Sequence, residues 1–220
     1  MSRLGRFQFK TDLAVRQLST VAREVMSGPQ LSGIFLEYLI ALHCIIRASE
    51  PLLQAASDEA ARRLQQGDAS CAGLPEYYAR HKEEEIDHAE WLLQDIEAMG
   101  VSRDVALARQ PSIDIAALAG SQYYWIYHYH PGFLLGYLAV LEGYPLNQKH
   151  IDHFQTQTGF PKEVFRTLQK HAELDPGHGD DLLRFLDECA LTDQVFEGLS
   201  TSAMATCAWL SQVLRALVLK

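Results

Sequence analysis

The pattern of apolar and polar positions is helical almost throughout the chain. Apolar residues recur every three or four positions between breaks marked by glycine and proline, and alternating runs rich in valine, isoleucine and threonine are missing. We therefore predict an all-α fold, a helical bundle in which kinks at Pro51 or Pro176 can join neighbouring segments. The predicted segments are 10–26, 31–48, 51–66, 75–99, 112–128, 132–143, 147–158, 161–173, 177–189 and 192–219.

Length and composition predict one soluble domain spanning residues 1–220. Apolar residues make up 48% of the chain and charged residues 21%, close to the globular average. The uncharged apolar runs, such as 133–141, fall far short of the ~20 residues that cross a bilayer. Residues 1–12 do not form an apolar signal segment. We expect a cytoplasmic protein with no membrane partner.

The charge of the chain argues against nucleic acid as a partner. Lysine and arginine number 19 and aspartate and glutamate 28, a net charge of −9, so a phosphate backbone is repelled on average.

The apolar final segment, 192–219, predicts either a core helix or the face of a homodimer. The cysteines form no CxxC pair, which excludes zinc ribbons and dithiol redox motifs. They are Cys44, Cys71, Cys189 and Cys207.

A first polar cluster lies in segment 75–99, whose apolar stripe is set by Leu92, Ile96 and Met99. Extending this stripe backwards at about 100° per residue places four ionisable side chains on the side that faces the core. Burial of such groups is costly unless they are paired or bound to a cation. The four are His81, Glu84, Glu85 and His88.

A second cluster consists of His171, Asp175 and His178, which share one face if the helix is continuous. Pro176 complicates this arrangement because it removes a backbone donor, so Asp175 is alternatively the cap of a new helix. A kinked helix can still direct all three side chains to one point.

Two further glutamates are candidates. Glu142 ends a long apolar run and is either a helix-end residue that reaches water or a buried ligand. Glu50 either joins the site or only favours the positive end of the helix that Pro51 opens.

Carboxylates and imidazoles from three or more helices thus converge on the interior of a bundle. Di-iron and di-manganese proteins build their sites in this way, from inward glutamates and Glu-x-x-His pairs, of which Glu85 to His88 is one. Mixed nitrogen and oxygen ligands without thiolate suit iron or manganese. We predict two iron ions per chain, with manganese as the alternative metal.

The chain resembles the heme-oxygenase-like, TenA-related superfamily, and within it the iron-containing redox enzymes, also called heme-oxygenase-like di-iron oxidases. The most specific motif is His171-x3-Asp175-x2-His178, which follows His88 and Glu142. The resemblance covers most of residues 31–187. It is carried by LSGIFLEYLIALHCIIRASEPLL, YYARHKEEEIDHAEWLLQDIEAMG, HPGFLLGYLAVLEGYP and TGFPKEVFRTLQKHAELDPGHGDDLLRFLD.

The resemblance implies a ligand set. In the family, the ligands come from a glutamate and a histidine on one core helix, a glutamate on the next, and the HxxxDxxH helix. Some members add an earlier glutamate, to which Glu50 corresponds. Some relatives have a glutamate seven residues before the histidine that corresponds to His88, and this chain has His81 at that position. His81, Glu84 and Glu85 therefore remain alternatives for completing the first metal site. The implied ligands are Glu85, His88, Glu142, His171, Asp175 and His178, with Glu50 in addition.

The family also implies dioxygen chemistry. We expect a non-heme di-iron oxidase or oxygenase that activates O2 at two ferrous ions and oxidises an amino acid, a fatty acid or a similar small molecule.

Three other functions stay open on the same fold. A heme oxygenase would use the GxxxG motif at 132–136 and His43 as the proximal ligand, and a TenA-type enzyme would need Cys44 or Cys189 as a nucleophile. In a metal-free interaction or cofactor-handling protein, hydrogen bonds would satisfy the polar core. The residues that would pair with each other in that case are His81, Glu84 and His171.

Overall fold

The computed structural model describes residues 1–219, apart from the side chains of Asp175 and Pro176. Every regular element within this part of the chain is a helix, which confirms the all-α prediction. The elements are α1 (Arg3–Met26), α2 (Leu31–Ile46), α3 (Ser49–Gln65), η1 (Ala69–Cys71), α4 (Leu74–Glu85), α5 (His88–Ala98), α6 (Arg103–Leu107), α7 (Ile113–His128), η2 (Pro131–Phe133), α8 (Leu134–Leu141), α9 (Gln148–Thr158), η3 (Lys162–Phe165), α10 (Arg166–Glu188) and α11 (Asp193–Val218).

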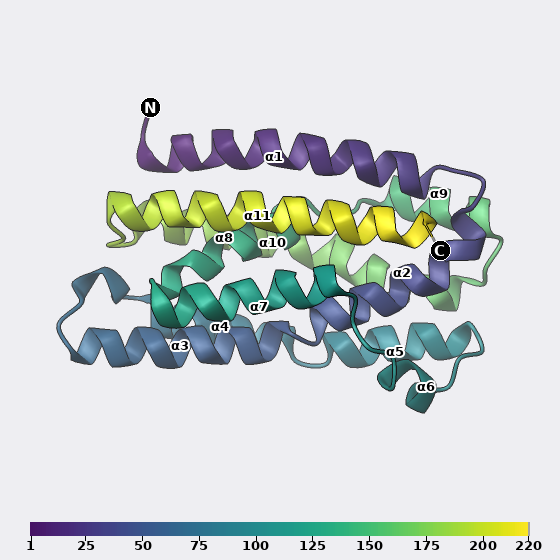
Figure 1. The fold of residues 1–220 in the computed structure, drawn as a ribbon, viewed down its shortest axis with the longest axis horizontal. Coiled ribbons are helices and arrows are strands. Elements are labelled where there is room, and N and C mark those ends of the chain that lie inside the picture. Colours follow the sequence, from purple (N-terminus) through teal and green to yellow (C-terminus); the bar gives the residue numbers. More distant parts are fainter. Residues whose placement is uncertain (220) are drawn as a thin grey trace.

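Two broken helices run along the bundle in opposite directions. The path of α2 and α3 is interrupted at residues 47–48, and the returning path of α4 and α5 is interrupted at residues 86–87 (Figure 1). On the other side of the bundle, α1 and α11 lie side by side and run in the same direction. The ion pairs of Arg3 with Asp193 and of Lys10 with Glu197 join the N-terminal halves of these two helices.

Polar caps fix where several helices begin. The Ser2 side chain accepts a hydrogen bond from the Gly5 N–H, and Ser112 and Thr192 do the same for the N–H groups three residues further on. Such bonds satisfy donors that the first turn of a helix leaves free.

The break between α4 and α5 corrects the predicted continuous helix 75–99. α4 ends at Glu85 and α5 begins at His88, because Asp87 adopts a left-handed backbone conformation with φ of 73°. Aspartate tolerates this region better than most residues with a side chain. No glycine or proline marks the position, so the sequence pattern does not reveal it.

Other boundaries also differ from the prediction. Segments 161–173 and 177–189, which the sequence left either separate or joined by a kink at Pro176, are joined in one element, α10, which runs from Arg166 to Glu188. α1 begins at Arg3 rather than at residue 10, and the short α6 was not predicted. The joining of the two segments in α10 matters most, since it carries the HxxxDxxH motif on one helix.

The apolar core consists of two clusters that meet near the helix break. Tyr77 and Tyr78 of α4 belong to the first cluster, whereas Leu92 and Ile96 of α5 belong to the second. α10 is divided in the same way, with Leu168 in the second cluster and Leu182 and Leu186 in the first. The stretches 81–88 and 171–178 therefore lie at the junction of the two apolar clusters.

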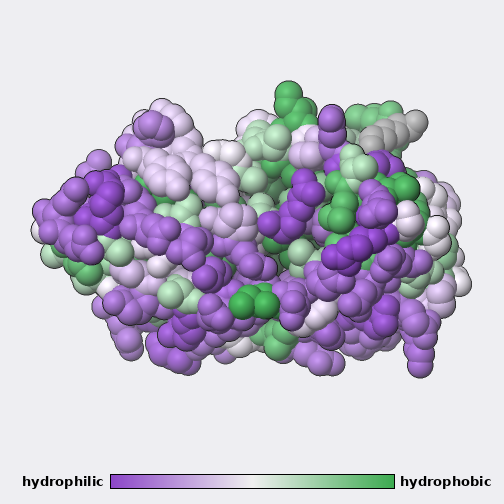
Figure 2. Space-filling view, turned by 90° about the horizontal axis from the view of Figure 1, so that it is seen from below, coloured by the Kyte–Doolittle hydropathy of each residue, from purple (hydrophilic) through white to green (hydrophobic). Residues whose placement is uncertain are grey.

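One helical stretch, Leu31–Gln65, is long and apolar enough to cross a membrane by length and composition alone. A core helix passes the same test, and Phe35, Leu39, Leu52 and Leu53 of this stretch are fully buried in the bundle. On the face seen in Figure 2, hydrophilic side chains predominate, and apolar ones gather toward the end that carries α5 and α6.

Gly136 of α8 lies at a close approach to α11, where a Cβ atom would be 2.1 Å from the Leu199 carbonyl oxygen. Because this neighbour is backbone, we expect Gly136→Ala to lower the free energy of unfolding by about 1–3 kcal/mol. The matched control is Gly120→Ala in α7, where a Cβ meets nothing within 4 Å. Denaturant unfolding of both variants measures the effect, and equal stabilities would contradict this packing.

Candidate metal centre

The candidate site is a buried polar layer between the two apolar clusters. α4 contributes His81 and Glu85, α5 contributes His88, and Glu142 directly follows α8. His171 and His178 come from α10 and are also mostly enclosed. The exposed fractions of His81, Glu85, His88 and Glu142 are 3%, 8%, 1% and 7%.

One half of this layer forms around Glu142, and we call it the Glu142 subsite. His81 Nε2 lies 2.9 Å from Glu142 Oε1 in a hydrogen bond. His178 Nδ1 lies 3.9 Å from the other carboxylate oxygen, and its ring packs edge-on against His81 with centroids 5.4 Å apart. Glu84 reaches both imidazoles, at 3.4 Å from His81 Nδ1 and 3.9 Å from His178 Nε2.

The other half, the Glu85 subsite, combines Glu85, His88 and His171. His88 Nδ1 lies 3.2 Å from Glu85 Oε1, and the rings of His88 and His171 are 4.7 Å apart. His171 Nδ1 lies 2.9 Å from the Thr167 carbonyl oxygen. As a neutral imidazole, His171 donates its Nδ1–H to this carbonyl, which leaves Nε2 with a free lone pair for a metal.

A hydrogen-bond chain holds the second subsite in place. The buried Asp95 of α5 accepts a hydrogen bond from the Thr167 N–H at 2.8 Å, which ties the start of α10 to α5. The carbonyl of the same Thr167 then orients His171. α5 thus supplies His88 and also fixes the position of its partner imidazole.

The two subsites meet at their carboxylates. One ligand atom each from His81, Glu85 and Glu142 lie within 4.8 Å of one another. Paired metal ions in proteins are ≈ 3.5–4 Å apart, so carboxylates at this spacing can serve two neighbouring cations.

The site's electrostatics follow from its burial. Burial lowers the pKa of His81, but the hydrogen bond to Glu142 and the charges of Glu142, Glu85 and Glu84 outweigh it, so that this pKa is raised. Burial raises the pKa of Glu142. Burial opposes ionisation of Glu85 as well, but the neighbouring His88 and His81 hold the pKa of Glu85 below its usual value. Burial lowers the pKa of His171, which favours its neutral, ligand-competent form.

Several buried polar atoms of the site have no hydrogen-bond partner among the described residues. They include Glu142 Oε2, His178 Nδ1 and the hydroxyl of Tyr137, and also His88 Nδ1, whose 3.2 Å contact with Glu85 Oε1 is an ion-pair contact without hydrogen-bond geometry. Each buried polar group without a partner costs about 1–3 kcal/mol, so the described residues of this layer do not form a fully satisfied hydrogen-bond network. Carboxylate oxygens and imidazole nitrogens in this state fit a bound iron or manganese cation.

The structure brings together five of the seven ligands suggested by the sequence: Glu85, His88, Glu142, His171 and His178. Glu50 is exposed in the first turn of α3, outside this buried layer, where its charge suits the helix terminus. The side chain of Asp175 lies outside the described residues. His81 and Glu84 were the alternatives to Glu85 for completing the first metal site. His81 is buried within the layer, whereas the Glu84 side chain is 36% exposed at the edge of the layer rather than facing the core.

Sequence reasoning missed the groups that support the ligands. Asp95 appears in the pattern as one more polar position of a helix, and Thr167 acts through its backbone, which no residue type reveals. Tyr137 lies within the apolar run that ends at Glu142. Burial raises the pKa of its hydroxyl, and the nearby carboxylates of Glu85 and Glu142 raise it further.

A cavity of about 580 Å³ opens beside Glu142. Its walls come from α1, from the segment after α8 and from α10, and Glu142 is one of its lining residues. The buried carboxylate is therefore within reach of a small molecule, and ligand pockets of this size are common.

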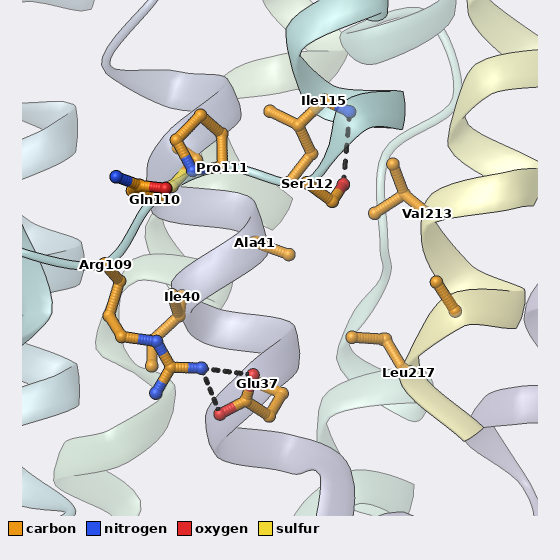
Figure 3. A pocket seen from close by; sticks show the side chains of 12 residues that line it. Glu37, Ile40, Ala41, Arg109, Gln110, Pro111, Ser112, Ile115, Val213 and Leu217 are labelled. Carbon is orange, nitrogen blue, oxygen red and sulfur yellow. Dashed lines mark hydrogen bonds and ion pairs between the residues drawn. The ribbon is translucent and has the colours of Figure 1, made fainter. Parts of the chain in front are cut away.

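A second cavity, of about 70 Å³, is far smaller and lies between α2, α7 and α11 (Figure 3). The Arg109 guanidinium donates two hydrogen bonds to the Glu37 carboxylate, at 2.7 and 2.6 Å, along its edge (Figure 3). Cys44 lines this crevice, and burial raises its pKa. Cys44, one of the two cysteines that a TenA-type reaction could use, therefore lines a different cavity from Glu142.

A second group of potential ligands, Asp68, Cys71 and His130, lies near η1. His130 Nδ1 accepts a hydrogen bond from the Gly132 N–H at 3.0 Å, so the neutral ring carries its proton on Nε2, which lies 3.0 Å from Ser70 Oγ. Neither nitrogen has a lone pair left for a cation. This cluster is best explained as a cap that joins η1 to η2.

The raised pKa of His81 predicts how the stability of the metal-free protein depends on pH. A group that holds its proton more tightly when folded stabilises the protein below its unfolded pKa, near 6.5, and this stability is lost as the pH rises through the folded pKa. Glu142, also raised, acts in the same direction. We expect the unfolding temperature of the wild type to fall more steeply above about pH 6.5 than that of His81→Gln.

The control for this experiment is His128→Gln, which changes an exposed histidine and should keep the wild-type slope. Thermal unfolding of the chelator-treated proteins over a pH series gives all three slopes. Parallel slopes for wild type and His81→Gln would show that the buried pair does not form as described.

Two solved structures share the whole fold. The chain resembles a domain of unknown function with a heme oxygenase-like fold from Shewanella denitrificans, with a TM-score of 0.79 and 15% sequence identity, covering 94% of this chain and 89% of that chain. A TenA homolog from Pseudomonas syringae pv. tomato gives a TM-score of 0.67 and 12% identity, covering 95% of this chain and 92% of that chain. These likenesses establish a heme-oxygenase-like fold.

Comparison with protein families identifies the chain more closely. No curated protein matches the sequence. The model of a family described as iron-containing redox enzymes matches residues 75–207, which is more than half of the chain and includes every candidate ligand except Glu50. The chain therefore belongs to the family of iron-containing redox enzymes.

Proposed function

We propose that this protein is a non-heme di-iron oxidase or oxygenase that uses O2 to oxidise a small molecule. The observation that carries the proposal is the buried meeting of Glu85 and Glu142 among four imidazoles, with ligand atoms left unpartnered. Such a cluster of opposed charges and lone pairs is expensive without a cation and well suited to two.

The two subsites suggest which residues would hold each metal ion. His81, Glu142 and His178 would hold one ion, and Glu85, His88 and His171 the other, with Asp175 added by the family motif. Bound as ferrous ions, the two irons would supply two electrons for the reduction of O2. Manganese is the alternative metal that the same ligands suit.

The chain's own groups position the ligands and handle protons. Asp95 and Thr167 fix the tautomer and direction of His171, as an outer hydrogen bond does for many metal ligands. Glu84 touches two imidazoles of the Glu142 subsite and reaches solvent, so it can exchange protons between the buried layer and water. The raised pKa of Tyr137, due to burial first and to Glu85 and Glu142 second, keeps its hydroxyl protonated as a hydrogen-bond donor.

The structure offers less support for the other functions on this fold. A heme oxygenase would need space beside Gly132 and Gly136 for heme to approach. Neighbouring protein atoms occupy this space, because a Cβ atom added at either glycine would collide with them. Cys189 is the other candidate nucleophile of a TenA-type enzyme. Its S–H group donates a hydrogen bond to the Leu186 carbonyl, and burial raises the pKa of the thiol. The unpartnered atoms at Glu142 and His178 weigh against a satisfied, metal-free polar core.

Anaerobic titration of the chelator-treated protein with ferrous iron tests the proposal. We expect two irons per chain in the wild type and at most one in Glu142→Ala or His178→Ala, because these changes remove ligands of the same subsite. Circular dichroism should show that the helical fold is kept. Exposure of the loaded protein to O2 should then oxidise the iron, as Mössbauer spectra would record.

Glu50→Gln is the matched control, since Glu50 is exposed in the first turn of α3. It should keep two irons. The proposal fails if the wild type takes up no iron, or if Glu142→Ala and His178→Ala both load as fully as the wild type.

A further inference from the structure

The two imidazoles of the Glu142 subsite lie between two carboxylates. His81 directs Nε2 to Glu142 Oε1 at 2.9 Å and Nδ1 to Glu84 Oε2 at 3.4 Å. His178 directs Nδ1 to Glu142 Oε2 at 3.9 Å and Nε2 to the same Glu84 oxygen at 3.9 Å. Each ring therefore presents one nitrogen to Glu142, inside the bundle, and the other nitrogen to Glu84.

Glu84 reaches solvent to a much greater extent than the groups behind it. Its side chain is 36% exposed, compared with 13% for His178 and 10% for Glu142. Its other oxygen, Oε1, lies 3.9 Å from the exposed guanidinium of Arg80. Exposed ion pairs of this kind contribute little to stability, so this pair can open and free the carboxylate. Glu84 is thus the outer end, and the unpartnered Glu142 Oε2 the inner end, of a line of ligand atoms that leads from water into the buried layer.

A metal ion that enters the buried layer must exchange its water for protein ligands. Loss of hydration is costly unless new ligands replace the water at each stage. Carboxylate oxygen binds iron and manganese, and so does imidazole nitrogen. Because Glu84 contacts both imidazoles, an ion that replaces some of its water with the Glu84 carboxylate is already next to its following two ligands.

We propose that Glu84 is the transfer residue of the Glu142 subsite, through which a divalent cation enters and leaves, and that it is not a ligand of the loaded site. This rests on the function proposed above, because it concerns how the metal reaches its ligands. A transfer residue lowers the barrier between the free and the bound ion. It therefore accelerates entry and release by the same factor and leaves the affinity unchanged.

The cavity beside Glu142 offers a different path for an ion. Asp12 and Asp180 are carboxylates on its walls. Within the described part of the chain, neither forms an ion pair or a hydrogen bond with an imidazole of the subsite, and Asp12 instead accepts a hydrogen bond from the Tyr144 hydroxyl. An ion on this path would cross the cavity before it met a ligand nitrogen, whereas Glu84 holds it in direct contact with two imidazoles.

Stopped-flow kinetics of cobalt(II) binding to the chelator-treated protein test the proposal. Cobalt(II) follows ferrous iron in affinity for nitrogen and oxygen ligands, and its visible absorbance reports uptake. Mixing the loaded protein with excess EDTA gives the rate of release. The kinetic phase that His178→Ala removes belongs to the Glu142 subsite. In this phase, we expect Glu84→Gln to slow uptake and release alike, each by about tenfold, with two ions still bound per chain.

Two variants serve as controls. Glu83→Gln removes the same charge from the preceding residue of α4, whose exposed carboxylate lies 3.9 Å from Lys82 Nζ. Asp180→Asn tests the path through the cavity. Both variants should keep the wild-type rates of uptake and release.

Wild-type rates in Glu84→Gln, or equal slowing in Glu83→Gln or Asp180→Asn, would overturn the proposal. Faster release or the loss of one bound ion in Glu84→Gln would also overturn it, because Glu84 would then act as a ligand or only through its charge. A wild type that binds neither cobalt(II) nor iron would refute the di-iron function as well. Two bound ions with unchanged kinetics in Glu84→Gln would refute this inference alone.

Discussion

The structure depends on how two carboxylates and four imidazoles are held between apolar clusters. Glu85 and Glu142 are more than nine-tenths buried, and the hydrogen bond between His81 and Glu142 joins α4 to the end of α8 across the bundle. Removing such groups from water is costly, and only opposite charge and well-placed ligand atoms can offset that cost. On the function proposed here, a pair of cations would supply the opposite charge and the carboxylates and imidazoles would supply the ligand atoms.

The helix break at Asp87 belongs to the same arrangement. It separates Glu85 from His88 and divides one predicted helix into α4, which packs in the first apolar cluster, and α5, which packs in the second. A residue with a side chain in the left-handed region costs energy, and such residues are often found at functional sites. Here the cost falls between two candidate ligands, and Asp95 on α5 then anchors the start of α10.

Much of the architecture could be predicted from the sequence, because helical periodicity and glycine or proline breaks are local signals. The stripe set by Leu92, Ile96 and Met99 predicted the inward direction of His81, Glu85 and His88, but it also predicted Glu84 to face the core, and that side chain is 36% exposed. The break at Asp87 could not be predicted, since a backbone conformation stabilised by tertiary packing leaves no mark in residue type. For the same reason, the pairing of His81 with Glu142 and the role of the Thr167 carbonyl required the three-dimensional structure.

The central claim is that the buried layer holds two metal ions side by side. Anomalous diffraction at the iron edge, from crystals grown anaerobically with ferrous iron, tests it most directly. Two peaks should appear, one at His81, Glu142 and His178 and one at Glu85, His88 and His171, with the spacing of ≈ 3.5–4 Å that paired metal ions show. A single peak elsewhere, or none within the layer, would contradict the account.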